Sequence, residues 1–384
     1  MRIAIVGGAL QGMEAVYLSK KAGFKTFVID RREDAPASSL ADDHAALDLV
    51  KDGKDAARIF EGCDAVLPAN ENMGLLCTLQ KLLSKSEIPL LFDMDSYKIS
   101  SSKSASNRLM EDAGIPIPKK WPECGYPAIV KPSSQSGSTG VTVAYNENDV
   151  NNGIKKVMDI GDEPVIQEFV SGKSVSMEVI GNGEEFRSFV TTEILLSKDY
   201  DCKRVRCTPD ILTDEKDEEF RTISENLAES IGLRSLMDVE AIDTKNGLRV
   251  LEIDARIPSQ TPAAVLAATG INILKEMIIP DERAYENMDS GSSSYEHFIV
   301  KDGKLMTCGE KEFSHVRGPR IVSGLFGSDE MITDYEHGKD LWWCTMINRA
   351  NTEKELEIKR SECIRSILNE CGLNEFIDLS PDVM

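Results

Sequence analysis

Carboxylates alternate along two neighbouring segments in the middle of the chain. Asp238 and Glu240 stand two apart in one predicted strand. Glu252, Asp254 and Arg256 alternate in the next one. Residues two apart on a strand point to the same face, so pairing of the two strands would bring four carboxylates and one guanidinium together. Without a cation this cluster is costly. Mg²⁺ takes carboxylate oxygens together with substrate phosphates, so the spacing predicts a magnesium site; the alternative is a solvent-facing acidic sheet surface.

A polar turn follows the second of these strands. Ser259, Gln260 and Thr261 stand between two prolines and lead into a predicted helix that starts at Pro262. A helix N-terminus presents unpaired backbone N–H groups and is a natural position for a carboxylate. The turn therefore favours a ligand site over a plain acidic surface.

Three earlier segments have the residue types of a nucleotide site. Lys103 follows a run of serines, and Lys131 ends a predicted strand. A loop rich in Ser and Gly follows Lys131 and contains Ser138. Small residues let backbone N–H groups face phosphate oxygens, while lysine supplies positive charge. The third segment, 166–170, is predicted as an edge-like strand whose backbone suits an adenine edge, with Glu168 accepting from the adenine amino group.

The N-terminal segment 3–12 has the pattern of a strand, a glycine turn and the start of a helix. A dinucleotide fingerprint would need glycine where Ala9 stands, so the glycines are better explained by closure of the turn. Asp30 and Asp48 follow the next two strands and are candidates for the ribose and adenine of a secondary nucleotide site. Glu71 follows the fourth strand, where open parallel sheets bind ligands, and its carboxylate suits a cationic substrate group.

A parallel sheet and later mixed units must position these residues. Short apolar runs alternate with helical spacing through the first hundred residues, which predicts βαβ units. The strands predicted there are 3–6, 26–29, 45–49, 65–67 and 90–92. Later strands are predicted at 128–131, 141–144, 165–169, 236–242 and 248–253, and later helices at 105–112, 220–231, 262–269 and 354–371. We expect an α/β and α+β multidomain chain with units at 1–98, 99–172, 173–290 and 291–384.

The composition is that of a globular chain with several cores. It has 384 residues, with 65 acidic and 44 basic residues and a net charge of −21 at pH 7. A field of that sign repels phosphate backbones and anionic lipid, so nucleic-acid and membrane partners are disfavoured. No apolar run reaches the length of a bilayer span. Nine scattered cysteines favour reduced thiols in a cytoplasm.

Taken together, these motifs resemble the ATP-grasp superfamily of carboxylate–amine ligases over most of the chain. Within it, the chain is most similar to the branch that joins 3-methyl-D-ornithine to L-lysine in pyrrolysine biosynthesis. The strings that carry this resemblance are 8–12, 70–72, 237–242, 253–256 and 258–262. The resemblance implies a Rossmann-like N-terminal domain before an ATP-grasp fold, and an ADP-forming ligase that uses ATP and Mg²⁺. D-Ornithine is the alternative acid substrate, and a homodimer is the candidate assembly.

The resemblance also implies a role for each candidate residue. ATP phosphates would meet Lys103, Lys131 and Ser138; the adenine would lie by Glu168, Phe169 and Val170, with Glu178 near the nucleotide. Mg²⁺ would bind Glu240, Glu252 and Asp254, while Arg256 would steady the transferred phosphate. L-Lysine matches Leu10, Gln11 and Glu71. The ornithine substrate matches Asp238, Ser259, Gln260 and Thr261, with Asp238 on an amino group.

Three positions depart from the superfamily pattern or stay open. Asp254 stands where many members have Asn, and Ser174 stands where many have a ribose-binding Glu. Either Lys203 or Arg204 would supply a phosphate-contacting base. Two other interpretations remain: an ATP-grasp ligase for other amino acids, such as a dipeptide ligase, and a nucleotide-binding sensor without turnover.

Overall fold

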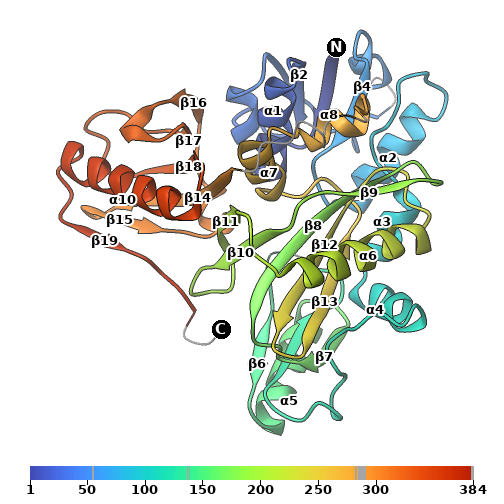
Figure 1. Ribbon diagram of the computed structural model, residues 1–384. Helices are drawn as coiled ribbons and strands as arrows, with labels where there is room; N and C mark the ends of the chain where they lie inside the picture. The colour runs from blue at the N-terminus through green and yellow to red at the C-terminus, as the bar shows by residue number, and fades with distance from the viewer. Residues whose placement is uncertain (54–55, 136, 138, 282, 284–290, 382–384) are drawn as a thin grey trace.

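The chain begins with a parallel sheet of four strands. In the computed structural model, which describes residues 1–53, 56–135, 137, 139–281, 283 and 291–381, these strands are β1 (Arg2–Val6), β2 (Lys25–Asp30), β3 (Asp43–Ala46) and β4 (Ala65–Pro68). They lie in the order β3-β2-β1-β4. Figure 1 shows this part of the chain in blue, with β2 and β4 labelled near the N-terminus. The connections contain α1 (Leu10–Lys21), η1 (Pro36–Ser39) and η2 (Ala56–Phe60), and α2 (Met73–Leu83) follows β4. The predicted βαβ rhythm is confirmed, although β3 begins earlier than predicted.

The fifth strand predicted at 90–92 is wrong. Only an isolated bridge joins Leu90 to Val66 of β4. Val66 donates to Pro89 O and accepts from Leu91 N. Pro89 and Pro68 have no N–H to donate, so the bridge does not extend into a ladder on either side.

A second, antiparallel sheet follows in the order β6-β5-β7. Its elements are β5 (Ala128–Pro132), β6 (Thr142–Ala144), α5 (Glu147–Asp159) and β7 (Pro164–Glu168), preceded by α3 (Met94–Ser100) and α4 (Lys103–Asp112). The helix α3 is not predicted from the sequence, because the serines around residue 100 are typical of a boundary between units. Ser102 instead caps α4 by accepting from Ala105 N at 3.3 Å.

The third sheet has twelve strands, all of them between residues 173 and 377. Its strands are β8 (Lys173–Gly181), β9 (Phe186–Ser188), β10 (Thr192–Leu196), β11 (Cys202–Cys207), β12 (Leu236–Thr244), β13 (Gly247–Asp254), β14 (Ser292–Lys301), β15 (Lys304–Thr307), β16 (Arg320–Ser323), β17 (Glu330–Thr333), β18 (Trp342–Ala350) and β19 (Glu375–Ile377). The main path runs β13-β12-β8-β10-β11-β14-β18-β17-β16. The helical elements are α6 (Asp214–Ser230), α7 (Thr261–Thr269), α8 (Ile273–Ile278), α9 (Glu310–Phe313), η3 (Leu325–Gly327) and α10 (Glu353–Glu370). Pairing of β11 with β14 carries one sheet across the unit boundary predicted at 290.

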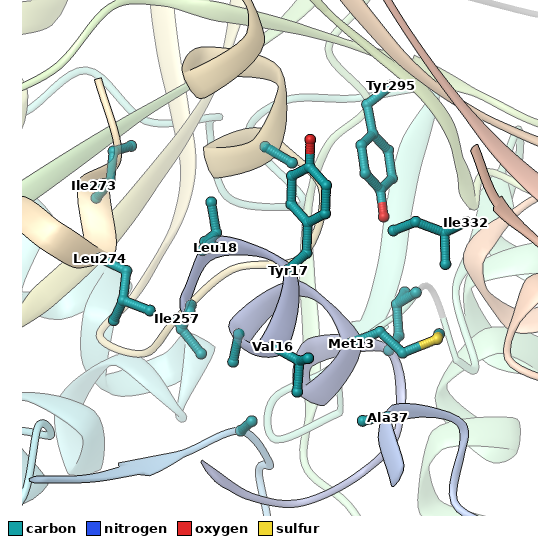
Figure 2. Close-up of a cluster of buried hydrophobic side chains, with 14 of the residues drawn as sticks. Met13, Val16, Tyr17, Leu18, Ala37, Ile257, Ile273, Leu274, Tyr295 and Ile332 are labelled. Atoms are coloured by element: carbon teal, nitrogen blue, oxygen red, sulfur yellow. The ribbon is translucent and has the colours of Figure 1, made fainter. Parts of the chain in front are cut away.

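The N-terminal unit packs on the large sheet through α1. Figure 2 shows Met13, Tyr17 and Leu18 of α1 facing Ile257, residues of α8 and Tyr295 of β14. Leu18 is fully buried, and burial of such a side chain contributes about 1.5–3 kcal/mol. This shared core fixes α1 against the segment between β13 and α7. None of the helices in the described ranges combines the length and the apolar composition needed to cross a bilayer.

A buried histidine in β14 should make stability depend on pH. His297 stacks on Phe313 at 4.3 Å between ring centroids, and its Nδ1 lies 2.7 Å from Thr345 Oγ1. Burial lowers the pKa of His297 to about 3, from an ordinary value of 6.5. Below pH 6.5 the unfolded chain therefore binds a proton that the folded chain does not, and stability falls as the pH falls. Relative to a His297→Phe variant, the wild type should lose about 2 kcal/mol of unfolding free energy between pH 7.5 and 5. Urea unfolding of both proteins measures this, and parallel pH curves would contradict it.

Candidate active site

The predicted carboxylates lie on one face of neighbouring strands. β12 pairs antiparallel with β13, and Glu240 lies opposite Glu252 while Asp238 lies opposite Asp254. The other face, which includes Val239, packs against α6 in an apolar core. The predicted strand pairing is confirmed. The metal-binding roles of these residues stay a prediction.

The negative charge of this face is shared unequally between the two opposed glutamates. Burial, followed by the charges of Glu252 and Asp238, raises the pKa of Glu240 well above its ordinary value. Burial acts on Glu252 too, but Lys103 and Lys131 outweigh it and lower the pKa of Glu252. Lys103 Nζ lies 2.9 Å from Glu252 Oε2. The two lysines therefore favour the charged form of Glu252, whereas burial and the neighbouring acids disfavour the charged form of Glu240.

Lys103, at the start of α4, and Lys131, in β5 just before the Ser/Gly loop, place positive charge beside these glutamates. Lys131 is buried, and burial lowers its pKa to about 8, against the opposing charge of Glu252. Lys103 Nζ also donates to Gln135 O at 2.9 Å, which ties the start of α4 to the Ser/Gly loop. The two lysines predicted for phosphate binding thus meet at the acidic pair. Ser138, predicted for the same role, lies outside the described residues.

The donor set of the acidic pair fits a magnesium ion. Glu240 and Glu252 present carboxylate oxygens, and the raised pKa of Glu240 marks a negative potential that a divalent cation would offset. Asp254, the third predicted ligand, instead lies 2.7 Å from Arg256 Nη2. Within the described ranges, no three Asp, Glu, His or Cys side chains are grouped closely enough to hold a metal as they stand. Two of the predicted ligands are therefore opposed, and the third is paired with an arginine.

Arg256 joins the acidic face to the N-terminal unit. Its Nη2 lies 2.7 Å from Asp254 Oδ2 and 2.8 Å from Glu71 Oε1. Gln11 Nε2 donates to Glu71 Oε1 at 3.2 Å. Burial lowers the pKa of Arg256, but Asp254 and Glu71 outweigh it and the net direction is upward. The structure thus brings Gln11 and Glu71 to the arginine predicted to steady phosphate. Leu10 of α1 is instead buried in the apolar core, and its predicted contact with L-lysine stays a prediction.

The N-terminal glycines are required by the geometry of the turn before α1. A Cβ atom at Gly12 would lie 2.2 Å from Gly7 O, so α1 can begin this close to the turn only with glycine. The Asp30 carboxylate accepts from Gly8 N at 2.7 Å, and Asp48 accepts from two backbone N–H groups of the turn that follows it. Both acids predicted for a secondary nucleotide site thus bind backbone N–H groups, and their nucleotide roles stay a prediction.

The polar turn before α7 is strained and held by an acid that the sequence did not predict. Gln260 is fully buried with φ +74° and ψ −50°, and Thr261 N donates to Ser259 O at 2.9 Å, which is the geometry of a γ-turn. Such a conformation costs a non-glycine residue about 1–3 kcal/mol. Glu310 of α9 accepts from Ser259 Oγ at 2.8 Å and from Gln260 Nε2 at 2.6 Å. The three predicted turn residues therefore lie together, fixed by Glu310.

Asp238 and Glu178 form a second acidic pair beside this turn. They lie opposite each other in the register of β12 and β8. The Ser176 hydroxyl donates to Asp238, whose pKa burial and then Glu178 raise well above the ordinary value. Burial raises the pKa of Glu178 to about 7. Glu178 was predicted near the nucleotide; the structure places it next to Asp238, and its nucleotide role stays a prediction.

The segment predicted for adenine is less open than expected. The backbone N–H of Glu168 donates to Lys119 O at 2.8 Å, and that of Phe169 donates to Pro127 O at 3.1 Å. The Glu168 carboxylate accepts from Lys119 N at 3.3 Å. β7 is an edge strand of its sheet, but the segment before β5 bonds to its outer side. The Phe169 ring packs edge-on against Tyr200 at 6.5 Å between centroids. Val170 follows directly, and the adenine roles of all three stay predictions.

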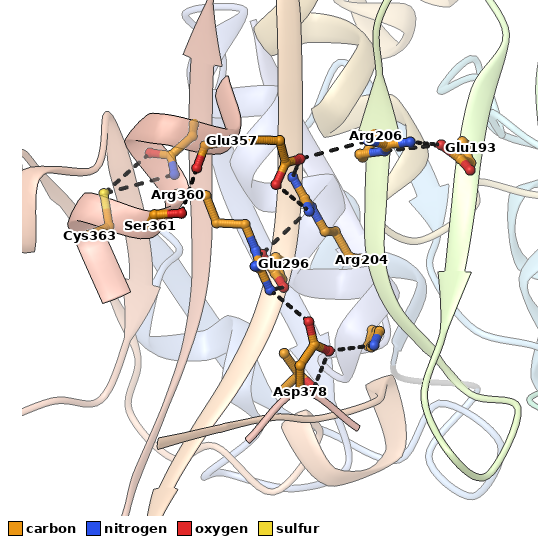
Figure 3. Close-up of polar contacts among 12 residues, drawn as sticks. Glu193, Arg204, Arg206, Glu296, Glu357, Arg360, Ser361, Cys363 and Asp378 are labelled. Atoms are coloured by element: carbon orange, nitrogen blue, oxygen red, sulfur yellow. Dashed lines mark hydrogen bonds and ion pairs between the residues drawn. The ribbon is translucent and has the colours of Figure 1, made fainter. Parts of the chain in front are cut away.

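Lys203 and Arg204, the two candidates for a phosphate-contacting base, are both engaged by the C-terminal region. Arg204 lies between Glu296 and Glu357, in a network of ion pairs that Figure 3 shows. Lys203 Nζ donates to Asp378 Oδ1 at 2.6 Å, to Leu379 O at 2.7 Å and to Ser380 Oγ at 2.8 Å. The structure therefore selects neither residue for phosphate.

Sequence reasoning missed Glu310 beside the turn and the buried acid Glu14 of α1. Glu310 is 51 residues from Ser259 of the turn that it holds, and no periodicity links the two. Glu14 was the more detectable, because it is one acidic residue in the otherwise apolar run 13–18 of α1. A charged residue inside an apolar helix face is a signal of a functional position.

Two family models match the chain between residues 3 and 260, and a known protein matches it over nearly its full length. Residues 3–91 match the model "PylC-like, N-terminal domain", and residues 100–260 match the model "ATP-grasp domain". A 3-methyl-D-ornithine–L-lysine ligase of Methanosarcina barkeri is 35% identical over 382 residues, which cover 96% of this chain and 98% of that one.

Solved structures share the fold at low identity. A biotin carboxylase–β-γ-ATP complex from Campylobacter jejuni has a TM-score of 0.75 at 16% identity, covering 96% of this chain and 91% of the other. A Hydrogenobacter thermophilus 2-oxoglutarate carboxylase domain, solved with MgADP and bicarbonate, has a TM-score of 0.72 at 16% identity, covering 94% and 89%. These likenesses confirm the predicted fold class.

Proposed function

The chain belongs to the family of ATP-grasp ligases that includes the Methanosarcina 3-methyl-D-ornithine–L-lysine ligases, and from this membership we propose that it catalyses the same reaction. As a member of this family it is an ATP-binding, ADP-forming acid–amino-acid ligase. The specific proposal is that the carboxylate of 3-methyl-D-ornithine, or of D-ornithine, is joined to the ε-amine of L-lysine in pyrrolysine biosynthesis. One observation carries it: Arg256 links Asp254 of the acidic face to Glu71 and Gln11 of the N-terminal unit.

The opposed charges suggest how a triphosphate would be held. Lys103 and Lys131 would take phosphate oxygens, since their ammonium groups meet at Glu252 beside the Ser/Gly loop. Glu240 and Glu252, with Asp254, would hold Mg²⁺, which when bound offsets the charge of the phosphates. Phe169 and its neighbours would lie against the adenine. The residues of the chain mainly position charged partners and stabilise developing charge.

The reaction would proceed by two displacements. The ornithine carboxylate attacks the γ-phosphate of ATP, which gives an acylphosphate and ADP. The neutral ε-amine of lysine then attacks the acyl carbon, and phosphate leaves as the amide forms. Arg256 would steady the transferred phosphate, while Glu71 would hold the lysine α-ammonium and leave the ε-amine free. The turn of Ser259, Gln260 and Thr261 would orient the ornithine substrate opposite Asp238.

Phosphate release and product mass test the proposal. With MgATP, D-ornithine and L-lysine, the protein should release ADP and phosphate and form a product with the mass of the two amino acids minus water. Omission of either amino acid should abolish product formation. A panel of other amino acids is the comparison. Turnover with alanine or another monoamino acid, and none with ornithine and lysine, would assign a different ligase reaction; no turnover with any pair would favour a nucleotide-binding sensor.

Glu71 gives a specific test of the lysine site. In Glu71→Gln the KM for L-lysine should rise about 30-fold, because a hydrogen bond between charged groups is worth about 1.5–3 kcal/mol. The KM for 6-aminohexanoate, which lacks the α-ammonium, should be the same in the wild type and the variant. Glu87→Gln, an exposed acid of the same N-terminal unit, is the control and should behave as the wild type. An equal rise for both amines would contradict the assigned contact.

A further inference from the structure

The short helix α3 is attached both to the N-terminal unit and to the large sheet. Its N-cap, Asp93, accepts from Ser96 N at 3.1 Å within the helix and from Arg234 N, just before β12, at 2.9 Å. The Tyr97 ring packs in a small apolar cluster with Leu76 of α2, which follows β4 of the N-terminal unit. The position of α3 therefore depends on both parts of the molecule at once.

A path of hydrogen bonds crosses α3 from the end of β13 to Glu71. Ala255 N, in the residue that follows β13, donates to Ser100 Oγ at 3.0 Å. Ser100 Oγ donates in turn to Tyr97 O at 3.3 Å, and the Tyr97 hydroxyl donates to Glu71 O at 3.3 Å. Ser100 and Tyr97 are both buried, so water competes little for these bonds. The path thus fixes the backbone of Glu71 relative to that of Ala255.

Both ends of this path lie next to the ion pairs of Arg256. Ala255 stands between Asp254 and Arg256 in the chain, and Glu71 is the acid that Arg256 Nη2 meets at 2.8 Å. The path through α3 and the ion pairs of Arg256 therefore close a ring of contacts. Fixed positions of both acids preserve the orientation of the planar guanidinium between them.

The surroundings of the Tyr97 hydroxyl make it a donor rather than a base. Burial raises the pKa of Tyr97 above its ordinary value, the charges of Asp254 and Glu71 raise it further, and Arg256 opposes them. The hydroxyl therefore stays protonated at neutral pH and keeps a hydrogen to donate to Glu71 O. Replacement of Tyr97 by phenylalanine would remove this donor and leave the ring in its apolar cluster.

We propose that Tyr97 and Ser100 are positioning residues that hold the Glu71 site for the amine substrate in place relative to Arg256. The inference rests on the proposed function, in which Glu71 holds the α-ammonium of L-lysine and Arg256 steadies the transferred phosphate. The ε-amine must reach the acyl carbon beside that phosphate, and a misplacement of about 1 Å can cost about 10²-fold in rate. Tyr97 sets the backbone that carries the Glu71 carboxylate, and Ser100 sets the backbone between Asp254 and Arg256.

Tyr97→Phe tests the Glu71 end of the path. The KM for L-lysine should rise about 5-fold, which is the effect of one hydrogen bond between neutral groups. The KM values for ATP, for D-ornithine and for 6-aminohexanoate, which lacks the α-ammonium, should stay within about 2-fold of the wild type. In the Glu71→Gln background the same change should add less than about 2-fold, because the contact that Tyr97 positions is already lost. Tyr145→Phe, which removes the hydroxyl of an exposed tyrosine, is the matched control and should behave as the wild type.

Ser100→Ala tests the β13 end of the path. It leaves the buried Ala255 N–H without a partner, and Arg256 is the next residue in the chain. We expect kcat, measured as ADP release with both amino acids, to fall about 10-fold, while the KM for ATP changes less than about 3-fold. Ser230→Ala, which removes an exposed hydroxyl from the end of α6, is the control and should leave both constants unchanged.

The outcomes separate this inference from the function on which it rests. Suppose that the wild type joins D-ornithine to L-lysine, but Tyr97→Phe leaves the KM for L-lysine unchanged or raises the KM for 6-aminohexanoate equally. Then α3 has only a structural role, and the inference is wrong while the function stands. If the wild type makes no product from these two amino acids, both are wrong. Should Ser100→Ala fail to fold, Tyr97→Phe decides, because its ring still fills the apolar cluster.

Discussion

Replacement of Glu252 by glutamine should lower kcat by about 10³-fold and leave the fold intact. Glu252 is the acid that keeps its charge, because Lys103 and Lys131 lower its pKa. Loss of that charge removes both the centre that orders the two lysines and one of the two opposed carboxylates proposed for Mg²⁺. Removal of one preorganised electrostatic group typically costs about 10²–10³-fold, and Glu252 serves two. ADP release with both amino acids measures the effect.

The stability cost of this change should be small. Lys103 and Glu252 are both partly open to solvent, and such ion pairs contribute about 0–1 kcal/mol. The midpoint of urea unfolding should therefore stay close to that of the wild type. Glu185→Gln removes an exposed carboxylate from the turn between β8 and β9 and serves as the charge-matched control. Turnover of Glu252→Gln within 10-fold of the wild type would place the phosphate-binding centre elsewhere.

The sequence predicted best the parts of the site that lie on regular strands. Alternation with period two fixes which face a side chain occupies, so the opposition of Glu240 and Glu252 followed from their spacing and from the pairing of two adjacent strands. Lys103 and Lys131 could be expected at one place because each borders a glycine- or serine-rich segment of the same unit.

What the sequence could not show depends on contacts between distant segments. Glu310 meets the turn at Ser259 because α9 packs beside it, and no local pattern encodes that approach. The outer side of β7 was expected to be free, but the segment at Lys119 bonds to it. The family resemblance assigned Asp254 to a metal, whereas the contacts of Arg256 with both Asp254 and Glu71 depend on where the N-terminal unit lies.

Arg256 is the residue through which these distant segments meet. Its guanidinium is within 2.8 Å of one acid from the N-terminal unit and one from the large sheet. A planar fork can bind two carboxylates at once, whereas a lysine ammonium is a single point charge on a flexible stem. The two substrates of the proposed reaction would lie on either side of this fork, with the phosphate of the acylphosphate between them.

Arg256→Lys should therefore lower kcat by about 300-fold although it keeps the positive charge. The transferred phosphate would lose a fixed donor, which is typically worth about 10²–10³-fold. The KM for L-lysine should rise as well, because Glu71 loses the partner that orients it. The KM for ATP should change less than about 5-fold, since Lys103 and Lys131 would still hold the other phosphates. Arg108→Lys, at an exposed position of α4, is the matched control and should leave all three constants unchanged. If Arg256→Lys retained the wild-type kcat, charge alone would be sufficient and the bridge between Asp254 and Glu71 would have no part in catalysis.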